Sequence, residues 1–223
     1  MVKEAISSGW DIEAIILIQE RAEEAEDFAP HTVYLTEEST FRQISQQPQP
    51  EGILAVLPFP ETPTWPPDCI AALPPGPGFI LEDMQDPGNL GTLIRTADWL
   101  GFQSIICSKG SVDVLNPKVL RSTMGSFFRV PVYYFSDLPG HLSNHLDHCW
   151  AADMDGQRLD QASFGAKDYI VLGNEANGLS VELRQLAGLK KLHIPGRGGA
   201  ESLNAAIAGA MIGWQLFCHI PKT

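Results

Sequence analysis

Three polar segments of this chain carry side chains that could do chemistry, at residues 86–95, 171–180 and 194–204. Each segment contains glycine and stands between an apolar run typical of a strand and a run typical of a helix. In open α/β sheets, ligands bind at such strand-to-helix loops. The segments include Arg95, Glu175, Ser202 and Asn204, which are groups able to hold an anion or to exchange hydrogen bonds.

Arg95 is predicted on the polar side of a helix that begins near Asn89, and Gly91 one turn earlier would leave room above the helix surface. The rigid guanidinium fork suits a phosphate or a developing oxyanion. The ordinary alternative is a surface ion pair with Asp98, three residues further along the same helix. The spacing alone leaves both interpretations open.

The other three polar side chains also have ordinary alternatives. Glu175 is the carboxylate of its loop, and it could instead serve as a capping residue ahead of the next helix. Ser202 and Asn204 stand where a helix cap is expected. The glycines near residue 198 lack both the P-loop pattern and the complete GxGxxG spacing, which disfavours sites for nucleotide phosphates.

The elements that must position these residues alternate between strands and helices from Phe79 onward, as in a parallel sheet with helices on both faces. The strands are predicted at 79–81, 104–107, 130–135, 150–152, 169–172 and 191–194. The helices are predicted at 89–100, 117–126, 137–147, 180–187 and 202–218. The last helix is apolar on nearly all sides, so we expect it to be buried. It also carries a row of small residues that would allow close packing within the fold or across a dimer interface.

Composition shifts divide the chain into three parts. Residues 1–58 predict a small α/β domain with strands near 12–18 and 52–57 and an exposed acidic helix at 20–27. Residues 59–78 predict a linker, since 58–77 hold eight of the 17 prolines, and proline removes backbone donors and fixes φ. Residues 79–223 form the predicted main domain.

The charge distribution argues weakly against nucleic acid but leaves room for it. The net charge is −12, and the first 58 residues, with 3 basic and 11 acidic side chains, are especially acidic. Between residues 109 and 129 the sign reverses, which is what contact with phosphates needs. The basic side chains there are Lys109, Lys118, Arg121 and Arg129, and a solvated helix face is an equally ordinary reading of them.

Several other classes of protein are disfavoured. The four cysteines form no CxxC pair, which argues against a zinc ribbon and suits reduced thiols in the cytoplasm. The histidines His141, His145 and His148 lack the glutamate of HExxH, so no metal site is expected. Residues 202–221 carry no formal charge, but their polar side chains favour a buried helix over a membrane span.

Taken in order, the three segments resemble the signature motifs of the SpoU (TrmH-like) RNA 2′-O-ribose methyltransferases of the SPOUT superfamily. The similarity covers residues 79–217 and includes 116–131, which resemble the family's segment between the first two motifs. It implies a mostly parallel α/β sheet with a C-terminal trefoil knot, S-adenosylmethionine as the cofactor, RNA (rRNA or tRNA) as the substrate, and a homodimer. As the residues themselves indicate, no metal and no membrane partner is expected.

The resemblance also assigns residues. Polar catalytic positions correspond to Asn89, Arg95, Glu175, Ser202 and Asn204. The methyl donor would be bound by Leu172, Gly173, Asn174, Ile194, Pro195, Ser202 and Leu203. RNA would be contacted by Arg95, Lys118, Arg121 and Arg129. Because guanidinium hardly ever deprotonates, we expect Arg95 to position the ribose and to stabilise the oxyanion rather than to act as a base.

The leading hypothesis is therefore an RNA ribose methyltransferase. One alternative is a non-catalytic RNA-binding member of the same fold, and another is an α/β enzyme with a nucleotide cofactor. Two departures from the family pattern stand out. Ala176 occupies a position that is often glycine, and the N-terminal domain, which begins at a Val-x-Glu-Ala pattern, lacks the usual first strand and is expected to be truncated.

Overall fold

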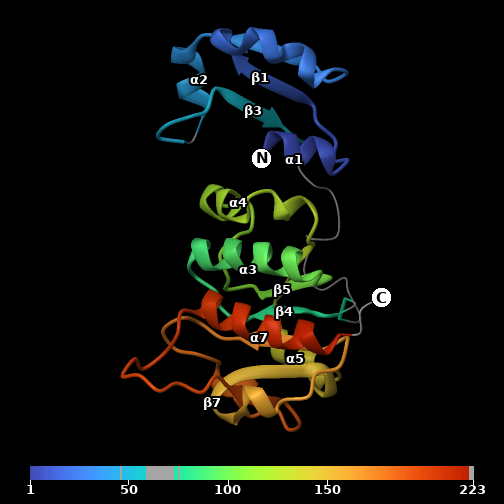
Figure 1. Cartoon of the computed structure of the whole chain (residues 1–223), viewed down its shortest axis with the longest axis vertical. Coiled ribbons are helices and arrows are strands. Elements are labelled where there is room, and N and C mark those ends of the chain that lie inside the picture. Colours follow the sequence, from blue (N-terminus) through green and yellow to red (C-terminus); the bar gives the residue numbers. More distant parts are fainter. Residues whose placement is uncertain (46, 59–72, 75, 221–223) are drawn as a thin grey trace. The chain divides into compact units, whose positions relative to one another are not determined.

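The computed structural model describes residues 1–45, 47–58, 73–74 and 76–220 of the chain (Figure 1). The chain forms two compact units, Met1–Glu61 and Thr62–Thr223. Most of the linker predicted at 59–78 lies outside the described residues.

The N-terminal unit is a three-stranded sheet with helices, and two of its strands lie where the apolar runs at 12–18 and 52–57 predicted them. Its elements are α1 (Val2–Ser7), β1 (Ala14–Ile18), the 3-10 helix η1 (Gln19–Phe28), β2 (Val33–Thr36), α2 (Glu38–Ile44) and β3 (Ile53–Val56). The strand order is β2-β1-β3, with β2 parallel and β3 antiparallel to β1. Ile15, Leu17 and Phe28 form the core. The acidic helix predicted at 20–27 is a 3-10 helix with a break at Arg21.

The C-terminal unit alternates strands and helices throughout. Its elements are β4 (Gly78–Leu81), α3 (Pro87–Leu100), β5 (Ser104–Ser108), α4 (Pro117–Thr123), the 3-10 helix η2 (Ser126–Phe128), β6 (Val132–Phe135), α5 (Leu138–Leu142), the 3-10 helix η3 (Leu146–His148), β7 (Cys149–Arg158), the 3-10 helix η4 (Leu159–Gln161), β8 (Tyr169–Leu172), α6 (Val181–Arg184), β9 (Lys190–His193) and α7 (Ala205–His219).

The six strands form one sheet in the order β6-β5-β4-β8-β7-β9, and every described pairing in it is parallel. The central strands β4 and β8 are buried along their whole length, which is why their sequences are continuously apolar. Because β4 and β8 are neighbours, the loops that follow them emerge side by side at the carboxyl edge of the sheet. This edge receives the first two polar segments.

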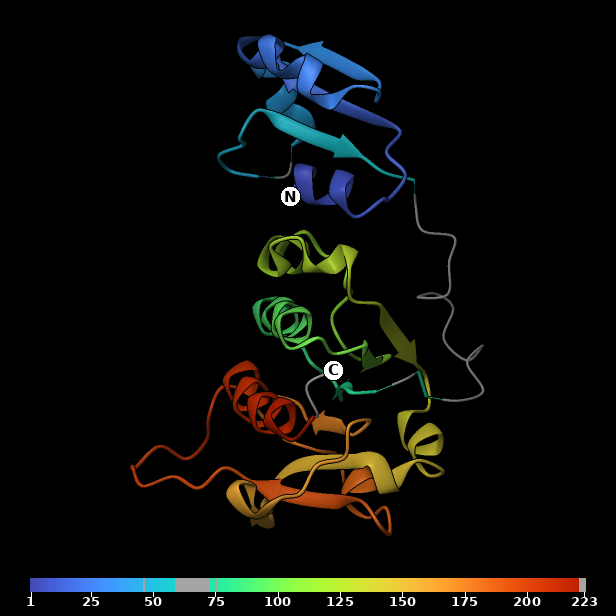
Figure 2. The ribbon, with the colours of Figure 1, turned by 45° about the vertical axis from the view of Figure 1, so that its right-hand side comes forward.

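Helices cover both faces of this sheet, as the alternation predicted. Leu81 of β4 belongs to a core shared with α3, α4 and α7, whereas Ile80 next to it belongs to a second core shared with α5 and α6. Figures 1 and 2 show α3 lying between α4 and α7. The first face therefore carries α3 and α7 side by side. The first polar segment lies at the start of α3, and the third polar segment ends where α7 begins.

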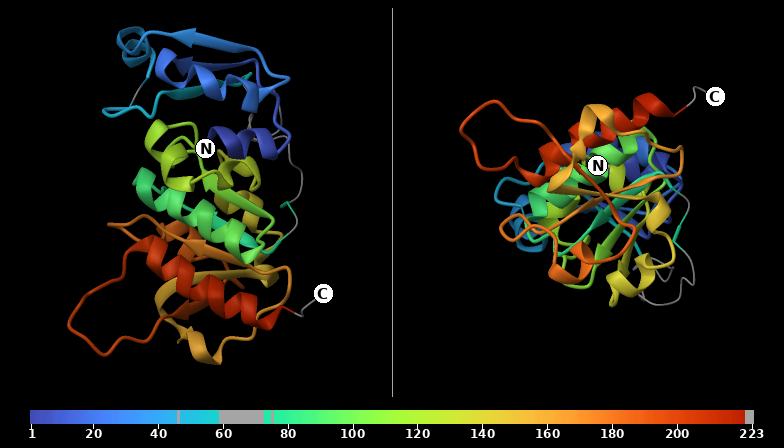
Figure 3. Two further views of the ribbon diagram at one scale, coloured as in Figure 1. Left: turned by 45° about the horizontal axis from the view of Figure 1, so that its top comes forward. Right: turned by 90° about the horizontal axis from the view of Figure 1, so that it is seen from below.

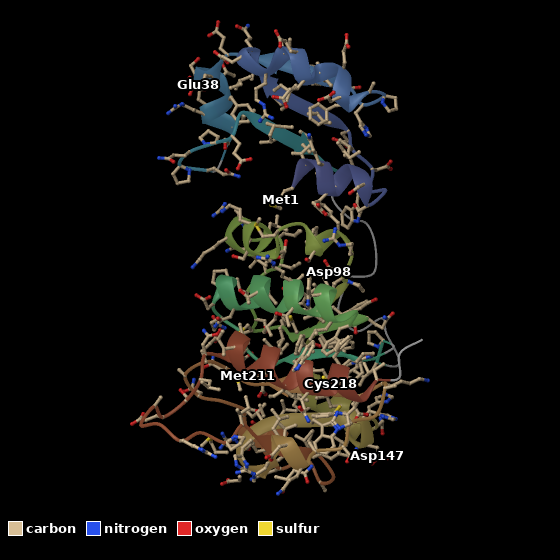
Figure 4. The ribbon with its side chains drawn as sticks, in the orientation of Figure 1. Met1, Glu38, Asp98, Asp147, Met211 and Cys218 are labelled. Carbon is tan, nitrogen blue, oxygen red and sulfur yellow. The ribbon has the colours of Figure 1, made fainter. Side chains whose placement is uncertain are left out.

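Helix α7 is buried on one side only, which corrects the prediction of burial nearly all round. The row of small residues faces inward, because a Cβ at Gly209 would lie 2.5 Å from Leu93 and one at Gly213 would lie 2.9 Å from Leu100. The opposite side is apolar and exposed: Leu203, just before the helix, Ile207, Met211, Trp214 and Phe217. Met211 is labelled on this helix in Figure 4.

Several element boundaries differ from the predictions. The helix predicted at 137–147 ends at Leu142, and a separate 3-10 turn follows. The strand predicted at 150–152 extends over Cys149–Arg158 through a bulge. The last helix starts at Ala205 rather than at 202, since Asn204 caps it. Within the described residues, no helix reaches the length and apolarity that a membrane span requires.

Candidate active site

The first polar segment forms the start of α3. Asp86 is the N-cap, its Oδ1 accepts a hydrogen bond from the backbone N–H of Asn89 at 2.8 Å, and Pro87 occupies the first helical turn. This is the ordinary capping arrangement for an Asp-Pro pair. The cap fixes the first turn, so the side chain of Asn89 is held at a defined point, where the residue is only 8% exposed.

The second polar segment is a tight loop after β8. The backbone N–H of Asn174 donates to Gly178 O at 2.9 Å, and the N–H of Gly178 donates back to Asn174 O at 2.8 Å. A Cβ at Gly173 would lie 2.2 Å from the backbone of Gly178, so only glycine allows this closure. The loop presents the carboxylate of Glu175 to the start of α3.

The carboxylate of Glu175 is fully engaged by the first segment. Its Oε2 accepts from the backbone N–H of Gln85 at 3.2 Å, and its Oε1 accepts from the N–H of Asp86 at 3.1 Å and from Asn89 Nδ2 at 3.0 Å. The predicted alternative role of capping its own helix is not seen, because Ser180 caps α6. Glu175 instead joins the second segment to the first.

Asn204 joins the third segment to the other two. Its Oδ1 caps α7 by accepting from the N–H groups of Ala206 and Ile207, while its Nδ2 donates to Asn89 Oδ1 at 2.9 Å. Asn89 therefore accepts from Asn204 and donates to Glu175. These three side chains, named here the Asn-Glu-Asn centre, come from three segments that are up to 115 residues apart in the sequence.

The hydrogen bonds also set the protonation state of the centre. Partial burial opposes ionisation of Glu175, but the hydrogen bonds from Asn89 and from the backbone N–H groups of Asp86 and Gln85 outweigh it. The pKa of Glu175 is consequently below its usual value. An ionised carboxylate with several donors is a poor proton acceptor. The centre is therefore suited to holding groups in a fixed geometry rather than to general-base catalysis.

Arg95 lies six residues beyond Asn89 on α3, and within the described residues it forms no hydrogen bond or ion pair with the Asn-Glu-Asn centre. It lines a surface groove of about 460 Å³ between α3 and α7, together with Thr96, Trp99, Leu100, Ala210 and Trp214. The predicted alternative of an ion pair with Asp98 is wrong, because Asp98 pairs with Arg129 at 2.8 Å. Arg95 thus remains exposed at the groove.

The predicted free space above Gly91 is absent. A Cβ there would lie 2.4 Å from Ser122 Cβ and 2.8 Å from the carbonyl oxygen of Val119, both on α4. Gly91 is the point at which two helices approach closely, so its function is packing. A ligand of Arg95 would have to approach from the α7 side.

Two of the predicted RNA contacts are already engaged by carboxylates. Arg129 donates to Asp98 through Nε and Nη2, and Lys118 Nζ lies 3.8 Å from Asp86 Oδ2. Arg121 is exposed and forms no ion pair within the described part of the chain. The basic patch therefore offers fewer unpaired positive charges than its sequence suggested, because the guanidinium of Arg129 forms an ion pair with Asp98.

The remaining residues of the third segment stay apart from the centre. Pro195, Ser202 and Leu203 are exposed, and residues 195–203 form no backbone hydrogen bond within the described part of the chain. Figure 3 shows this segment extending away from the rest of the C-terminal unit. Of the five predicted catalytic residues, the structure brings Asn89, Glu175 and Asn204 together, and it leaves Arg95 and Ser202 outside.

The residues expected to hold S-adenosylmethionine fit that role in part. Leu172 ends β8, Gly173 follows it and Ile194 follows β9, and since both strands flank β7 in parallel, these residues lie at one sheet edge. Gly173 makes no backbone hydrogen bond within the described residues, so its N–H and C=O are available to a ligand. The side chain of Asn174 does not fit.

Asn174 is committed to the loop itself. Its Nδ2 donates to Asp83 O at 2.9 Å, and its Oδ1 accepts from the N–H groups of Ala176 and Asn177 at 3.0 Å. Glu82, which was not among the predicted site residues, is a buried carboxylate directly after β4 that accepts from the N–H of Ser180 at 2.7 Å. An acidic residue directly after an apolar strand was the signal that could have identified it.

The described residues contain no cluster of side chains that could hold a metal ion. The helix predicted to carry the histidines is interrupted, so they do not share one helical face. His141 Nδ1 lies 2.7 Å from Asp137 O, whereas His148 Nδ1 lies 3.2 Å from the buried carboxylate of Asp168.

The chain is similar to known proteins in sequence and in fold. Residues 78–214 match the SpoU rRNA Methylase family. The chain is 29% identical to the 23S rRNA (guanosine(2553)-2′-O)-methyltransferase RlmP of Bacillus subtilis (strain 168), over 97% of this chain and 85% of that protein. It spans about half the length of several longer relatives, at 44–48%.

Solved structures give the same result. A putative RNA methyltransferase of the TrmH family from Porphyromonas gingivalis is 30% identical with a TM-score of 0.81, over 96% of this chain and 85% of that one. An AdoMet-bound rRNA methyltransferase from Sinorhizobium meliloti is 27% identical with a TM-score of 0.80, over 99% and 85%. The chain therefore belongs to the SpoU family of S-adenosylmethionine-dependent RNA ribose 2′-O-methyltransferases.

Proposed function

We propose that this chain transfers a methyl group from S-adenosylmethionine to a ribose 2′-hydroxyl of ribosomal RNA, with the Asn-Glu-Asn centre as the core of its active site. The observation that carries the proposal is the pair of hydrogen bonds that joins Asn204 to Asn89 and Asn89 to Glu175. Three motif segments distant in sequence meet there, at the carboxyl edge of a parallel sheet where ligands bind.

The residues of the chain would act mainly by positioning. Bound S-adenosylmethionine supplies an electrophilic methyl group. Main-chain groups of Gly173 and Ile194 hold the donor at the sheet edge, and the Asn-Glu-Asn centre fixes the loops around it. Orientation of this kind is worth several kcal/mol in the reaction, roughly 7–11 in well-aligned cases.

Arg95 holds the ribose through its phosphate and stabilises the emerging oxyanion. Its exposed guanidinium supports this role, because it is always charged and offers a planar fork to phosphate oxygens. We expect Arg95→Lys to lose most methyl transfer while S-adenosylmethionine still binds. Turnover of that variant equal to wild type would remove Arg95 from the chemistry.

Ribosomal RNA is favoured over transfer RNA because the relative from Bacillus subtilis and the neighbour from Sinorhizobium meliloti are both named as rRNA methyltransferases. Phosphate contacts would come from Arg95 and Arg121, which carry no ion pair within the described residues, and from Lys118, whose ion pair with Asp86 is long at 3.8 Å and exposed to solvent. The buried thiols of Cys107 and Cys149 suit a reducing compartment, and we place the protein in the cytoplasm.

A second copy of the chain is proposed to cover the exposed side of α7. Trp214 is 56% exposed and stacks on Phe217, which is 40% exposed, and Ile207 and Met211 continue the same apolar strip. An apolar strip of this size is costly in water, at about 25 cal/mol per Å². It adjoins the groove of Arg95, so a homodimer would bring a second chain next to this residue.

The dimer can be tested with a charged residue at the centre of the strip. Sedimentation of the wild-type protein should give a dimer, whereas Met211→Glu should give a folded monomer. A wild-type monomer at micromolar concentration would refute the dimer without touching the enzyme assignment.

A C-terminal trefoil knot completes the proposal. The chain leaves the sheet at β9, an edge strand, and returns as α7 to pack against α3 on the first face. This return supports a knot of the SpoU type around the donor. To test it, the protein is unfolded in urea, its two termini are joined covalently, and refolding is followed. Slow refolding of this circularised chain would indicate a threaded path, and refolding at the ordinary rate would indicate an unthreaded one.

The activity is tested by methyl transfer to defined RNAs. Tritiated S-adenosylmethionine is incubated with the protein and with unmodified rRNA or tRNA transcripts, and the product is mapped by resistance to alkaline cleavage. Incorporation at one rRNA ribose, lost in Asn89→Ala, is the expected result. Titration calorimetry with S-adenosylmethionine, S-adenosylhomocysteine, NAD and ATP should show saturable binding of the first two alone. Binding without transfer to any RNA would instead indicate the non-catalytic alternative.

A further inference from the structure

The buried carboxylate of Glu82 has no part in the mechanism above. Glu82 follows the last residue of β4 and is 7% exposed, although a carboxylate is costly to bury. Its backbone N–H continues the sheet by donating to Leu172 O at 2.8 Å. Its side chain leaves the sheet and accepts from the N–H of Ser180 at 2.7 Å, across 98 residues of sequence.

The bond to Ser180 closes the second loop at its exit. The entry of that loop is fixed by the pairing of β8 with β4. Asp83, directly after Glu82, accepts from Asn174 Nδ2 through its carbonyl oxygen at 2.9 Å. Neighbouring residues at the end of β4 therefore hold the start and the end of the loop that carries Glu175.

The third connection is made by Glu175 itself, which accepts from Gln85 and Asp86 and from the side chain of Asn89. The segment 82–89 is thus bonded to the loop 174–180 at successive points. Glu175 can hold Asn89 only while the loop 174–180 keeps its position. The hydrogen bond from the N–H of Ser180 to the carboxylate of Glu82 fixes the end of that loop. Hydrogen bonds to an ionised acceptor are about twice as strong as neutral ones.

We propose that Glu82 is a positioning residue for methyl transfer, because it seats the second loop so that Glu175 holds Asn89 in the reaction centre. This inference rests on the proposed function. Glu82 does not touch the reacting groups, and it acts through Ser180 and the loop. A purely structural contribution to the fold is the alternative that the experiment must separate.

The chain offers a matched control in Asp168, the other buried carboxylate among the described residues that accepts a backbone hydrogen bond. It accepts from Gly165 N at 2.9 Å and from Trp150 Nε1 at 2.7 Å, and its Oδ1 lies 3.2 Å from His148 Nδ1; within the described residues none of these hydrogen bonds reaches the first or second loop. Glu82→Ala and Asp168→Ala each delete one buried acceptor of backbone N–H. Glu82→Gln retains a neutral acceptor within reach of Ser180.

Two readouts are measured on the full-length protein, well below the melting temperature of each variant. The first is kcat and KM for S-adenosylmethionine and for RNA. The second is the ¹H–¹⁵N resonance of the Asn89 side-chain amide, assigned by its absence in Asn89→Ala, which reports the hydrogen bond to Glu175. This resonance requires no substrate and remains informative even without turnover.

For Glu82→Ala we expect kcat to fall about 30-fold, the equivalent of one lost charged hydrogen bond, with little change in KM. The Asn89 amide should move to the position of a solvated amide. Glu82→Gln should recover kcat to within about three-fold and restore the amide shift. Asp168→Ala should lower the melting temperature but leave kcat and the amide resonance unchanged.

An unchanged Asn89 amide and unchanged kcat in Glu82→Ala would overturn the proposal. Equal losses of kcat in Glu82→Ala and Asp168→Ala would also overturn it, because they would show general destabilisation. A wild-type protein that methylates no RNA would refute the proposed function, and the amide resonance would still decide whether Glu82 positions Asn89.

Discussion

Replacing Asn89 with aspartate tests the Asn-Glu-Asn centre most directly. Asn89→Asp keeps the size of the side chain but turns the donor that faces Glu175, at 3.0 Å, into a second carboxylate. Two like charges at that distance repel by about 1.4 kcal/mol in bulk water and by about 5.5 kcal/mol at an effective dielectric constant of 20. Glu175 is exposed, so solvent screening places the repulsion near the lower value, at about 1.5–3 kcal/mol.

This repulsion raises the upper apparent pKa of the two carboxyl groups in Asn89→Asp. At about 1.4 kcal/mol per pKa unit, the pair of carboxyls should show an upper apparent pKa about 1–2 units above the ordinary glutamate value near 4.3. In the wild-type protein the pKa of Glu175 is instead below its usual value, because hydrogen bonds outweigh burial. The substitution therefore reverses the direction of the shift.

The sign of the effect on stability follows from the two shifts. A lowered pKa in the wild type stabilises the folded protein above pH 4.5, and this is lost as the pH falls. In Asn89→Asp, a proton shared by the two carboxyls restores a hydrogen-bond donor at low pH, and the raised pKa then favours the folded protein. This stabilisation is lost as the pH rises through about 6. The destabilisation of the variant should thus grow by about 1.5–3 kcal/mol between pH 4.5 and 8.

The assay combines a ¹³C-carboxyl NMR titration with urea unfolding at pH 4.5 and pH 8. Asn89→Ala is the control, since it removes the donor without adding a charge, and its cost should vary little with pH. Methyl transfer by Asn89→Asp at pH 8 should fall at least about 100-fold, because the loop around Glu175 is repelled. A pair titrating at ordinary values, with equal destabilisation at both pH values, would refute the geometry of the centre.

Two further predictions concern packing and thiol chemistry. Gly91→Ala should destabilise the protein by about 1–3 kcal/mol in thermal or urea unfolding despite the better helix propensity of alanine, because its Cβ would lie 2.4 Å from Ser122. Gly196→Ala, in open space, should stay within about 0.5 kcal/mol of wild type, and equal effects would contradict the close approach of the two helices. Burial raises the pKa of Cys149 to about 12, whereas Cys218 is exposed, so peptide mapping after brief alkylation at pH 8 should find modification at Cys218 and none at Cys149. Equal labelling of both thiols would show that Cys149 is accessible.

Much of the architecture was predictable from local patterns. The continuous apolar runs at Phe79 and Tyr169 indicated buried parallel strands, and the helix predicted from residue 117 begins at Pro117 with Asn116 as its cap. The helix expected near Asn89 begins two residues earlier, at Pro87. These signals are local, since capping and burial of a strand depend on residues close in sequence or on hydrophobicity alone. Element ends such as the break after Leu142 were missed, because they depend on packing against distant residues.

The candidate site was only partly predictable for the same reason. The resemblance assigned Asn89, Glu175 and Asn204 to one family pattern, but that they bond to one another is a fact of tertiary structure. Arg95 shows the opposite case, because its expected partner Asp98 is taken by Arg129 from another segment. Pairing of charges across the fold cannot be read from i, i+3 spacing.

The sequence by itself determined the alternation of strands and helices, the three polar segments between them and the family to which they belong. Each of these depends on residues that are close together along the chain. Only the tertiary structure decided which side chains meet. The parallel order places β4 beside β8, so Glu82 and Glu175 can bond to residues nearly 100 positions away. It also decided that the row of small residues on α7 packs within the fold, against α3, and that the opposite apolar side of α7 is exposed.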